Sequence, residues 1–102
     1  MTRTDVLAWL AGRVPVPPDA LAAHLAAAVV DRDAALPDHL AREGAELLAR
    51  VTGAPVPGRE RALDLLAADA FVTYAFEAQA EFDVSGLHAL AERVDRIEAE
   101  PR

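Results

Sequence analysis

A chain of 102 residues with a net charge of −7 and no cysteine is expected to form one domain, residues 1–102, around a single hydrophobic core. The lack of cysteine excludes disulfides and thiolate chemistry, and the acidic balance disfavours free nucleic acid and anionic membranes as partners, because both bind basic surfaces. No apolar run is long enough to span a membrane, and the first residues do not resemble a secretory signal, so the sequence predicts a cytoplasmic protein.

Apart from the three histidines, every basic residue is an arginine: the chain has ten arginines, no lysine and no asparagine, and it is rich in alanine. Alanine, arginine, glycine and proline share G/C-rich codons, so this composition indicates a bacterial protein from a G/C-rich genome. The alternative is that arginine serves the bidentate recognition of anions. The seventeen acidic residues favour codon bias as the explanation.

Breaks at proline and glycine divide the chain into five predicted helices. In chain order they cover about residues 4–13, 18–32, 37–52, 59–83 and 85–100. No run of alternating β-branched residues indicates a strand. The sequence therefore predicts an all-α fold, a compact bundle of four to five helices around one long central helix at about 59–83.

The first helix contains the only tryptophan, Trp9, and Thr4 is its predicted N-cap. Tryptophan dominates many protein interfaces, so Trp9 is a candidate interface anchor. The interpretation we favour is that it pins this short helix to the bundle. The second helix presents Leu21, Leu25 and Val29 on one side and is expected to bury them.

The third helix repeats apolar residues at helical spacing and includes Gly44, which predicts the close approach of another helix at that position. It also carries His39, Glu43 and Glu46, which share a face. These side chains could offer one nitrogen and two oxygens to a metal ion, but a solvated polar face opposite Leu40 explains them more simply. We therefore predict no metal site and no bound cofactor.

The fourth helix has no proline or glycine from Arg59 to Asp83, and its middle, Leu65 to Phe76, is apolar on almost every side. A helix of this kind must be surrounded, so the sequence predicts a buried central helix with only a narrow polar strip that includes Asp69 and Glu77. Four short helices could cover that circumference, or a second subunit could contribute. A homodimer is therefore one of the predicted states.

Asp69 stands between two alanines in the most apolar part of this helix. If it were buried, its charge would be costly without a partner, and it would be a candidate acid, base or ligand contact. Phe71, Tyr74 and Phe76 would then line a small-molecule site inside the bundle. The simpler alternative is that Asp69 reaches solvent and that Tyr74 anchors the core with its hydroxyl at the edge.

The fifth helix places Arg96 and Glu100, and likewise His88 and Glu92, at the i,i+4 spacing of surface pairs, and Ser85 is its predicted cap. The order of the last three helices, medium, long and medium, is similar to that of the histone fold, whose long helix crosses between shorter ones and dimerises. This resemblance is in helix lengths alone and implies no DNA binding, which needs basic loops.

Motifs for catalysis are missing from the sequence. Ser85 is the only serine, no Gly-x-Ser-x-Gly is present, and the segment 53–58 is too rich in proline to wrap a phosphate. An enzyme built from these residues would be unusual. The sequence favours a non-catalytic protein-interaction or dimerising module, as in an adaptor or a small regulator. The alternatives are a small-molecule site near Asp69 and Tyr74, and an acidic regulator of a nucleic-acid-binding protein.

Overall fold

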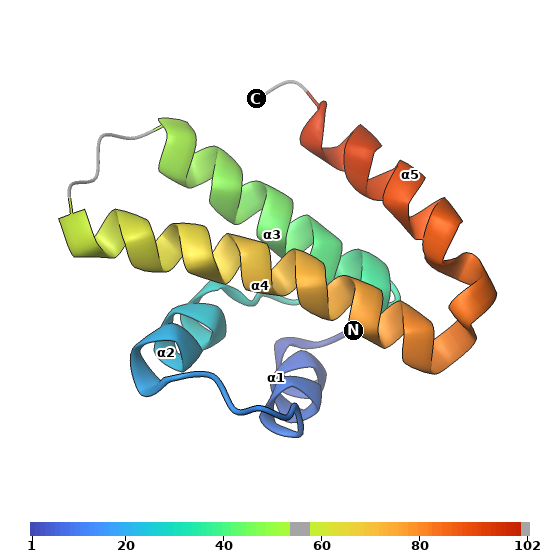
Figure 1. The fold of residues 1–102 in the computed structure, drawn as a ribbon, viewed down its shortest axis with the longest axis horizontal. Helices are drawn as coiled ribbons and strands as arrows, with labels where there is room; N and C mark the ends of the chain where they lie inside the picture. Colours follow the sequence, from blue (N-terminus) through green and yellow to red (C-terminus); the bar gives the residue numbers. More distant parts are fainter. Residues whose placement is uncertain (54–57, 101–102) are drawn as a thin grey trace.

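Five α-helices and one turn of 3₁₀ helix make up the described part of the chain, residues 1–53 and 58–100, in the computed structural model (Figure 1). They are α1 (Arg3–Ala11), α2 (Asp19–Ala28), α3 (Leu36–Gly53), α4 (Gly58–Asp83), η1 (Val84–Gly86) and α5 (Leu87–Glu98). No strand occurs in these residues, so the predicted all-α fold is confirmed. The predicted break at 53–58 falls largely on residues 54–57, which lie outside the described residues.

Helix α4 is the long central helix against which the others pack (Figure 1). Helix α3 runs alongside it and makes the most extensive helix contact of the described residues, while α5 turns back from the end of α4 and packs on both. Helices α1 and α2 lie on the other side of α4 from α5 in this view. All five helices contribute to the core, through residues no more than 3% exposed: Val6, Leu25, Leu40, Phe71 and Leu90.

The two longest helices, α3 and α4, approach each other closely at Gly44. A Cβ atom on Gly44 would lie 2.9 Å from the carbonyl oxygen of Ala68 and 2.9 Å from Cγ2 of Val72. Backbone cannot move aside as a flexible side chain can, so only glycine fits between α3 and α4 here. The close approach predicted at Gly44 is confirmed.

Helix α4 is buried on one side only, so the prediction that Leu65 to Phe76 is covered all round is wrong. Its buried stripe is Ala67, Ala68, Phe71, Ala75 and Ala78. Leu65 is 37% exposed and Leu66 is 55% exposed, and the polar strip with Asp69 and Glu77 faces solvent. The neighbouring helices cover one side of α4, and single exposed leucines are ordinary on protein surfaces.

Helix α2 ends at Ala28, four residues earlier than predicted, because Val29 adopts an extended backbone with φ −69° and ψ 130°. The backbone of Val30 then bonds to side chains of α3 in place of a helical partner. Its N–H donates to Oε1 of Glu43 at 3.1 Å, and its carbonyl accepts from Nε2 of His39 at 2.8 Å. These two bonds fix the segment between α2 and α3 against the face of α3.

At two helix starts the observed cap is a residue close to the predicted one. The hydroxyl of Thr2, and not that of Thr4, accepts from the N–H of Asp5 at 3.1 Å and caps α1. At the end of α4, Oδ1 of Asp83 accepts from the N–H of Ser85 at 3.1 Å, so Asp83 is the cap of η1. Within residues 1–53 and 58–100 no helix combines the length and apolarity needed to cross a membrane.

Candidate functional site

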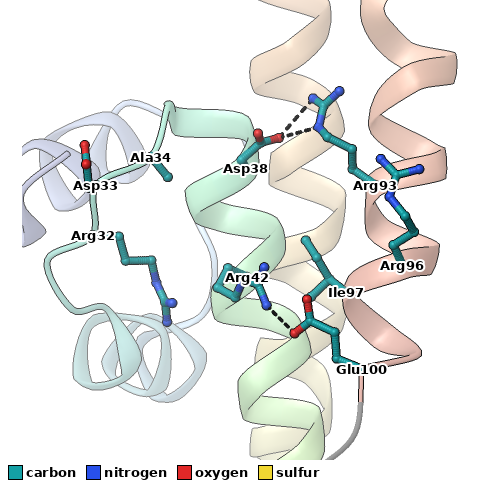
Figure 2. A pocket seen from close by; sticks show the side chains of 9 residues that line it. All are labelled: Arg32, Asp33, Ala34, Asp38, Arg42, Arg93, Arg96, Ile97 and Glu100. Atoms are coloured by element: carbon teal, nitrogen blue, oxygen red, sulfur yellow. Dashed lines mark hydrogen bonds and ion pairs between the residues drawn. The ribbon is translucent and has the colours of Figure 1, made fainter.

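A groove of about 510 Å³ lies between α3, α5 and the segment that precedes α3, and it gathers four of the ten arginines of this acidic chain (Figure 2). Figure 2 shows side chains of α3 and α5 facing one another across the space between the two helices. The residues that line it are Arg32, Asp33, Ala34, Asp38, Arg42, Arg93, Arg96, Ile97 and Glu100. We call this the arginine groove.

Two ion pairs cross the arginine groove, one from α3 to α5 and one from α3 to Glu100, which lies just after α5. Arg93 donates to Oδ1 of Asp38 from Nε at 3.0 Å and from Nη2 at 2.9 Å, and Arg42 donates from Nη1 to Glu100 at 2.6 Å (Figure 2). The four side chains are 35% to 50% exposed, so water competes for these pairs and each adds little stability. The i,i+4 spacing predicts a pair of Arg96 and Glu100, and this prediction is wrong, because Glu100 pairs with Arg42.

Arg96 differs from the other three arginines of the groove. It is exposed and forms no ion pair or hydrogen bond with any residue in the described part of the chain. Its neighbour along the groove, Ile97, is half-buried and packs against the core. The arginine groove thus combines the unpaired guanidinium of Arg96, the exposed carboxylate of Asp33, two exposed ion pairs and a short apolar contact at Ile97.

Arg32 also belongs to a buried polar network with Glu43 and His39, two side chains that were predicted to face solvent. Glu43 is 2% exposed and His39 is fully buried, so the predicted solvated face is wrong for both and correct only for the exposed Glu46. Oε1 of Glu43 accepts from Nε of Arg32 at 2.9 Å and from the N–H of Val30. The carboxylate is buried because it holds the segment before α3 in place.

His39 takes part in the same network. A carbonyl oxygen only accepts, so Nε2 of His39 carries the proton that it donates to Val30, and Nε2 also lies 3.4 Å from Oε1 of Glu43. Its Nδ1 is buried without a partner among the described residues. No group of three histidine or carboxylate side chains in residues 1–53 and 58–100 is arranged to hold a metal ion.

The structure does not bring Asp69 together with the three aromatic rings proposed beside it. Asp69 is exposed, at the edge of a small groove of about 220 Å³ whose lining includes none of those rings. Phe71 is fully buried in the stripe of α4 that faces the core, while Tyr74 and Phe76 are half-buried. The acid, base or ligand role depended on a buried Asp69, and the structure does not provide that burial.

Trp9 fastens α1 to α4, as we favoured. Its ring meets Tyr74 edge-on at 6.0 Å between centroids and 86° between planes, and its Nε1–H donates to Oε1 of Glu81 at 3.3 Å. The Arg13 guanidinium lies 3.9 Å from the centre of the Trp9 ring and donates to Glu81 at 2.7 Å. The hydrogen bond from Arg13 lowers the pKa of Glu81, and burial raises the pKa of the Tyr74 hydroxyl.

A second candidate surface lies where α4 meets η1. Phe82 is 77% exposed and Val84 is 66% exposed, and we call these two residues the apolar corner. Phe82 follows Phe71, Ala75 and Ala78 at helical spacing, so it continues the buried stripe of α4 to a position that no other helix covers.

No family model, curated protein or solved structure matches this chain. The resemblance to the histone fold therefore stays one of helix lengths.

Proposed function

We propose that this chain is a non-catalytic protein-interaction module that binds a protein partner, or a second copy of itself, through the apolar corner. The observation that carries the proposal is the exposure of Phe82, 77% of whose surface is open to solvent. Phenylalanine gains strongly from burial, and aromatic side chains are enriched in the cores of protein interfaces. A second subunit or another protein would supply the cover that the helices of this chain do not.

The backbone around the corner is held in place, which supports a docking role. Nε2 of Gln79 donates to the carbonyl of Asp83 at 2.8 Å, and Asp83 in turn accepts from the hydroxyl of Ser85 at 2.6 Å. Gly86 leaves room for Gln79, because a Cβ atom there would collide with its amide. A corner already ordered in the free protein loses little conformational entropy when it binds.

The carboxylates beside the corner are already engaged within the chain. Glu81 accepts from Trp9 and Arg13, and Asp83 accepts from Ser85. An apolar partner that covers Phe82 would thus meet fewer free charges than the sequence Glu-Phe-Asp implies. This arrangement favours contact through the ring of Phe82.

The experiment compares Phe82→Asp with Val14→Asp. Val14 is 89% exposed in the segment between α1 and α2, so it is a control that also adds one carboxylate in place of an exposed apolar side chain. Solution mass is measured by analytical ultracentrifugation at tens of micromolar, and protein partners are captured from native cells by a photocrosslinker at position 84. Circular dichroism verifies that both variants fold.

The proposal expects either a mass above the 10.8 kDa of one chain or one partner crosslinked in fixed ratio. Phe82→Asp should abolish either signal and Val14→Asp should keep it. A monomer with no partner specific to the corner, or equal losses in the two variants, would overturn the proposal.

A further inference from the structure

The arginines of the groove have more N–H donors than the carboxylates of the groove bind. Arg96 has no partner among the described residues, and Arg42 reaches Glu100 through Nη1 while a guanidinium offers five N–H donors in a planar fork. Carboxylates of the chain already balance the charges of Arg32, Arg42 and Arg93, so the charge without a partner among the described residues is that of Arg96. An anion from outside the chain would balance that remaining charge.

Arg32 and Arg96, both in the lining of the groove, differ in whether their charge is already balanced. Arg32 is anchored from behind by the buried Glu43 and by an ion pair with Glu46, so its charge is already balanced. Arg96 stands on α5 with its charge unbalanced by any described residue. An incoming anion would meet Arg96 first, with Arg93 one turn earlier on the same helix.

The chain itself demonstrates the chemistry of the groove. Arg42 binds one carboxylate oxygen of Glu100 through Nη1, and Arg93 binds Oδ1 of Asp38 through Nε and Nη2, so both guanidinium groups already bind anionic oxygens (Figure 2). Glu100 is 50% exposed and lies just after the end of α5, so breaking its ion pair with Arg42 costs little free energy. Glu100 therefore competes with an external anion for Arg42.

We propose that the arginine groove binds a small molecule with two anionic groups, either a dicarboxylate or a phosphate ester that carries a second anionic group. Arg96 and Arg93 bind one anionic group, and Arg42 binds the other after it releases Glu100. Ile97 offers an apolar contact to the carbon frame between the two groups. The volume of about 510 Å³ lies within the range of small-molecule sites. This proposal is independent of the apolar corner.

The first test titrates the protein with inorganic phosphate and, separately, with succinate, at constant ionic strength set by sodium chloride. Binding is followed by the NMR signals of the arginine Nε–H groups and of the α5 backbone. Saturable shifts should appear at Arg93, Arg96 and Arg42 and not at Arg59, which is an exposed arginine of α4. Saturation with phosphate alone identifies a phosphate ester as the ligand class, and saturation with succinate alone identifies a dicarboxylate.

Paired variants distinguish specific binding in the groove from attraction of anions by net charge alone. Arg96→Gln should weaken binding about tenfold, the effect of losing a charged hydrogen bond, whereas Arg59→Gln, with the same change in net charge, should weaken it by less than about twofold. Glu100→Gln removes the competitor and should tighten binding by about two- to fivefold. Glu77→Gln, on the exposed strip of α4, is its matched control and should have little effect.

Three results would overturn the proposal. The first is the lack of saturable shifts with either anion up to about 10 mM, a range that covers weak millimolar sites. The second is equal weakening by Arg96→Gln and Arg59→Gln, which would mean that only net charge matters. The third is weaker binding in Glu100→Gln, since Glu100 would then support the site and not compete for it.

Discussion

Helix α4 has the more apolar central segment, but helix α3 is the more deeply buried of the two. Ten of the eighteen residues of α3 are buried, including the polar His39 and Glu43, whereas only five of the twenty-six residues of α4 are buried. Helix α4 carries the longer apolar run, yet Leu66 lies 55% exposed on its outer side. Burial in this protein therefore follows the position of a helix in the bundle more closely than its composition.

The difference has a geometric cause. Helix α3 is covered by α4, by α5 and by the segment that runs from Val29 to Ala35, so even the polar His39 and Glu43 lose contact with water. Helix α4 meets its neighbours along a stripe composed mainly of alanine, which lets backbones approach closely at Gly44. Its outer side, which includes Leu66 and Asp69, faces solvent in the single chain.

The largest effect is expected from Phe71→Ala. Phe71 is fully buried at the centre of the α4 stripe, and removing a buried aromatic ring costs about 3–5 kcal/mol of unfolding free energy. Leu66→Ala, five residues earlier on the exposed side, should cost less than about 1 kcal/mol. Urea denaturation monitored by circular dichroism measures both. If Leu66→Ala costs as much as Phe71→Ala at high protein concentration only, a second copy covers the outer side of α4.

A similar loss is expected in α3 from Glu43→Ala. It would leave Arg32 without its buried partner and the N–H of Val30 without an acceptor, and breaking a buried pair in this way costs about 3–5 kcal/mol. The control is Glu46→Ala, which removes the exposed partner of the same arginine and should cost less than about 1 kcal/mol. Equal effects in denaturant titrations would show that the network gains nothing from its burial.

Much of the fold was predictable because proline, glycine and helical spacing act locally. The five helices appear in the predicted order, and Gly44 indicated a close approach that the structure confirms. Trp9 packs α1 against α4, as its place in a short helix indicated. His88 and Glu92 form the predicted surface pair, with Nε2 of His88 3.0 Å from Oε1 of Glu92. These features depend on one helix or on one contact at a time.

The buried network and the arginine groove depend on residues that come together only in three dimensions. At about 100° per residue Glu43 lies about 60° from Leu40, so the helical geometry of α3 did place it beside the apolar face. Its partner Arg32 stands on a segment that was predicted to be helical, so no sequence spacing linked the two. The groove likewise joins Arg42 and Arg96, which are far apart in the chain, and the exclusive use of arginine was the only sign of it.

A smaller effect is expected at the contact between the two helices. Gly44→Ala gains helix propensity of about 1 kcal/mol but forces Cβ into the carbonyl of Ala68, so a net loss of about 1–3 kcal/mol is expected. Gly53→Ala, in the last turn of the same helix, meets nothing within 4 Å and should be neutral or stabilising. A stabilising Gly44→Ala in thermal denaturation would mean that α3 and α4 can separate without loss.

The smallest effect concerns His24, which links α2 to α4. Its Nδ1 lies 2.9 Å from the carbonyl of Ala20 and its Nε2 lies 3.2 Å from Glu60, with Asp64 at 3.9 Å. Both ring nitrogens face acceptors, which favours the doubly protonated ring. The hydrogen bond to Ala20 and then that to Glu60 raise the pKa of His24 above 6.5.

A raised folded-state pKa means that protonated His24 stabilises the fold, and the sign of the pH dependence follows. The stabilisation is fully present below the unfolded pKa of about 6.5 and is lost as pH rises through the higher folded value. The difference in unfolding free energy between the wild type and His24→Gln should therefore shrink as the pH rises above about 6.5. His88→Gln, which removes an imidazole from an exposed pair, is the control for the loss of one histidine. A difference for His24→Gln that is constant or grows with pH would mean that α2 docks on α4 through packing alone, as the buried Leu25 would permit.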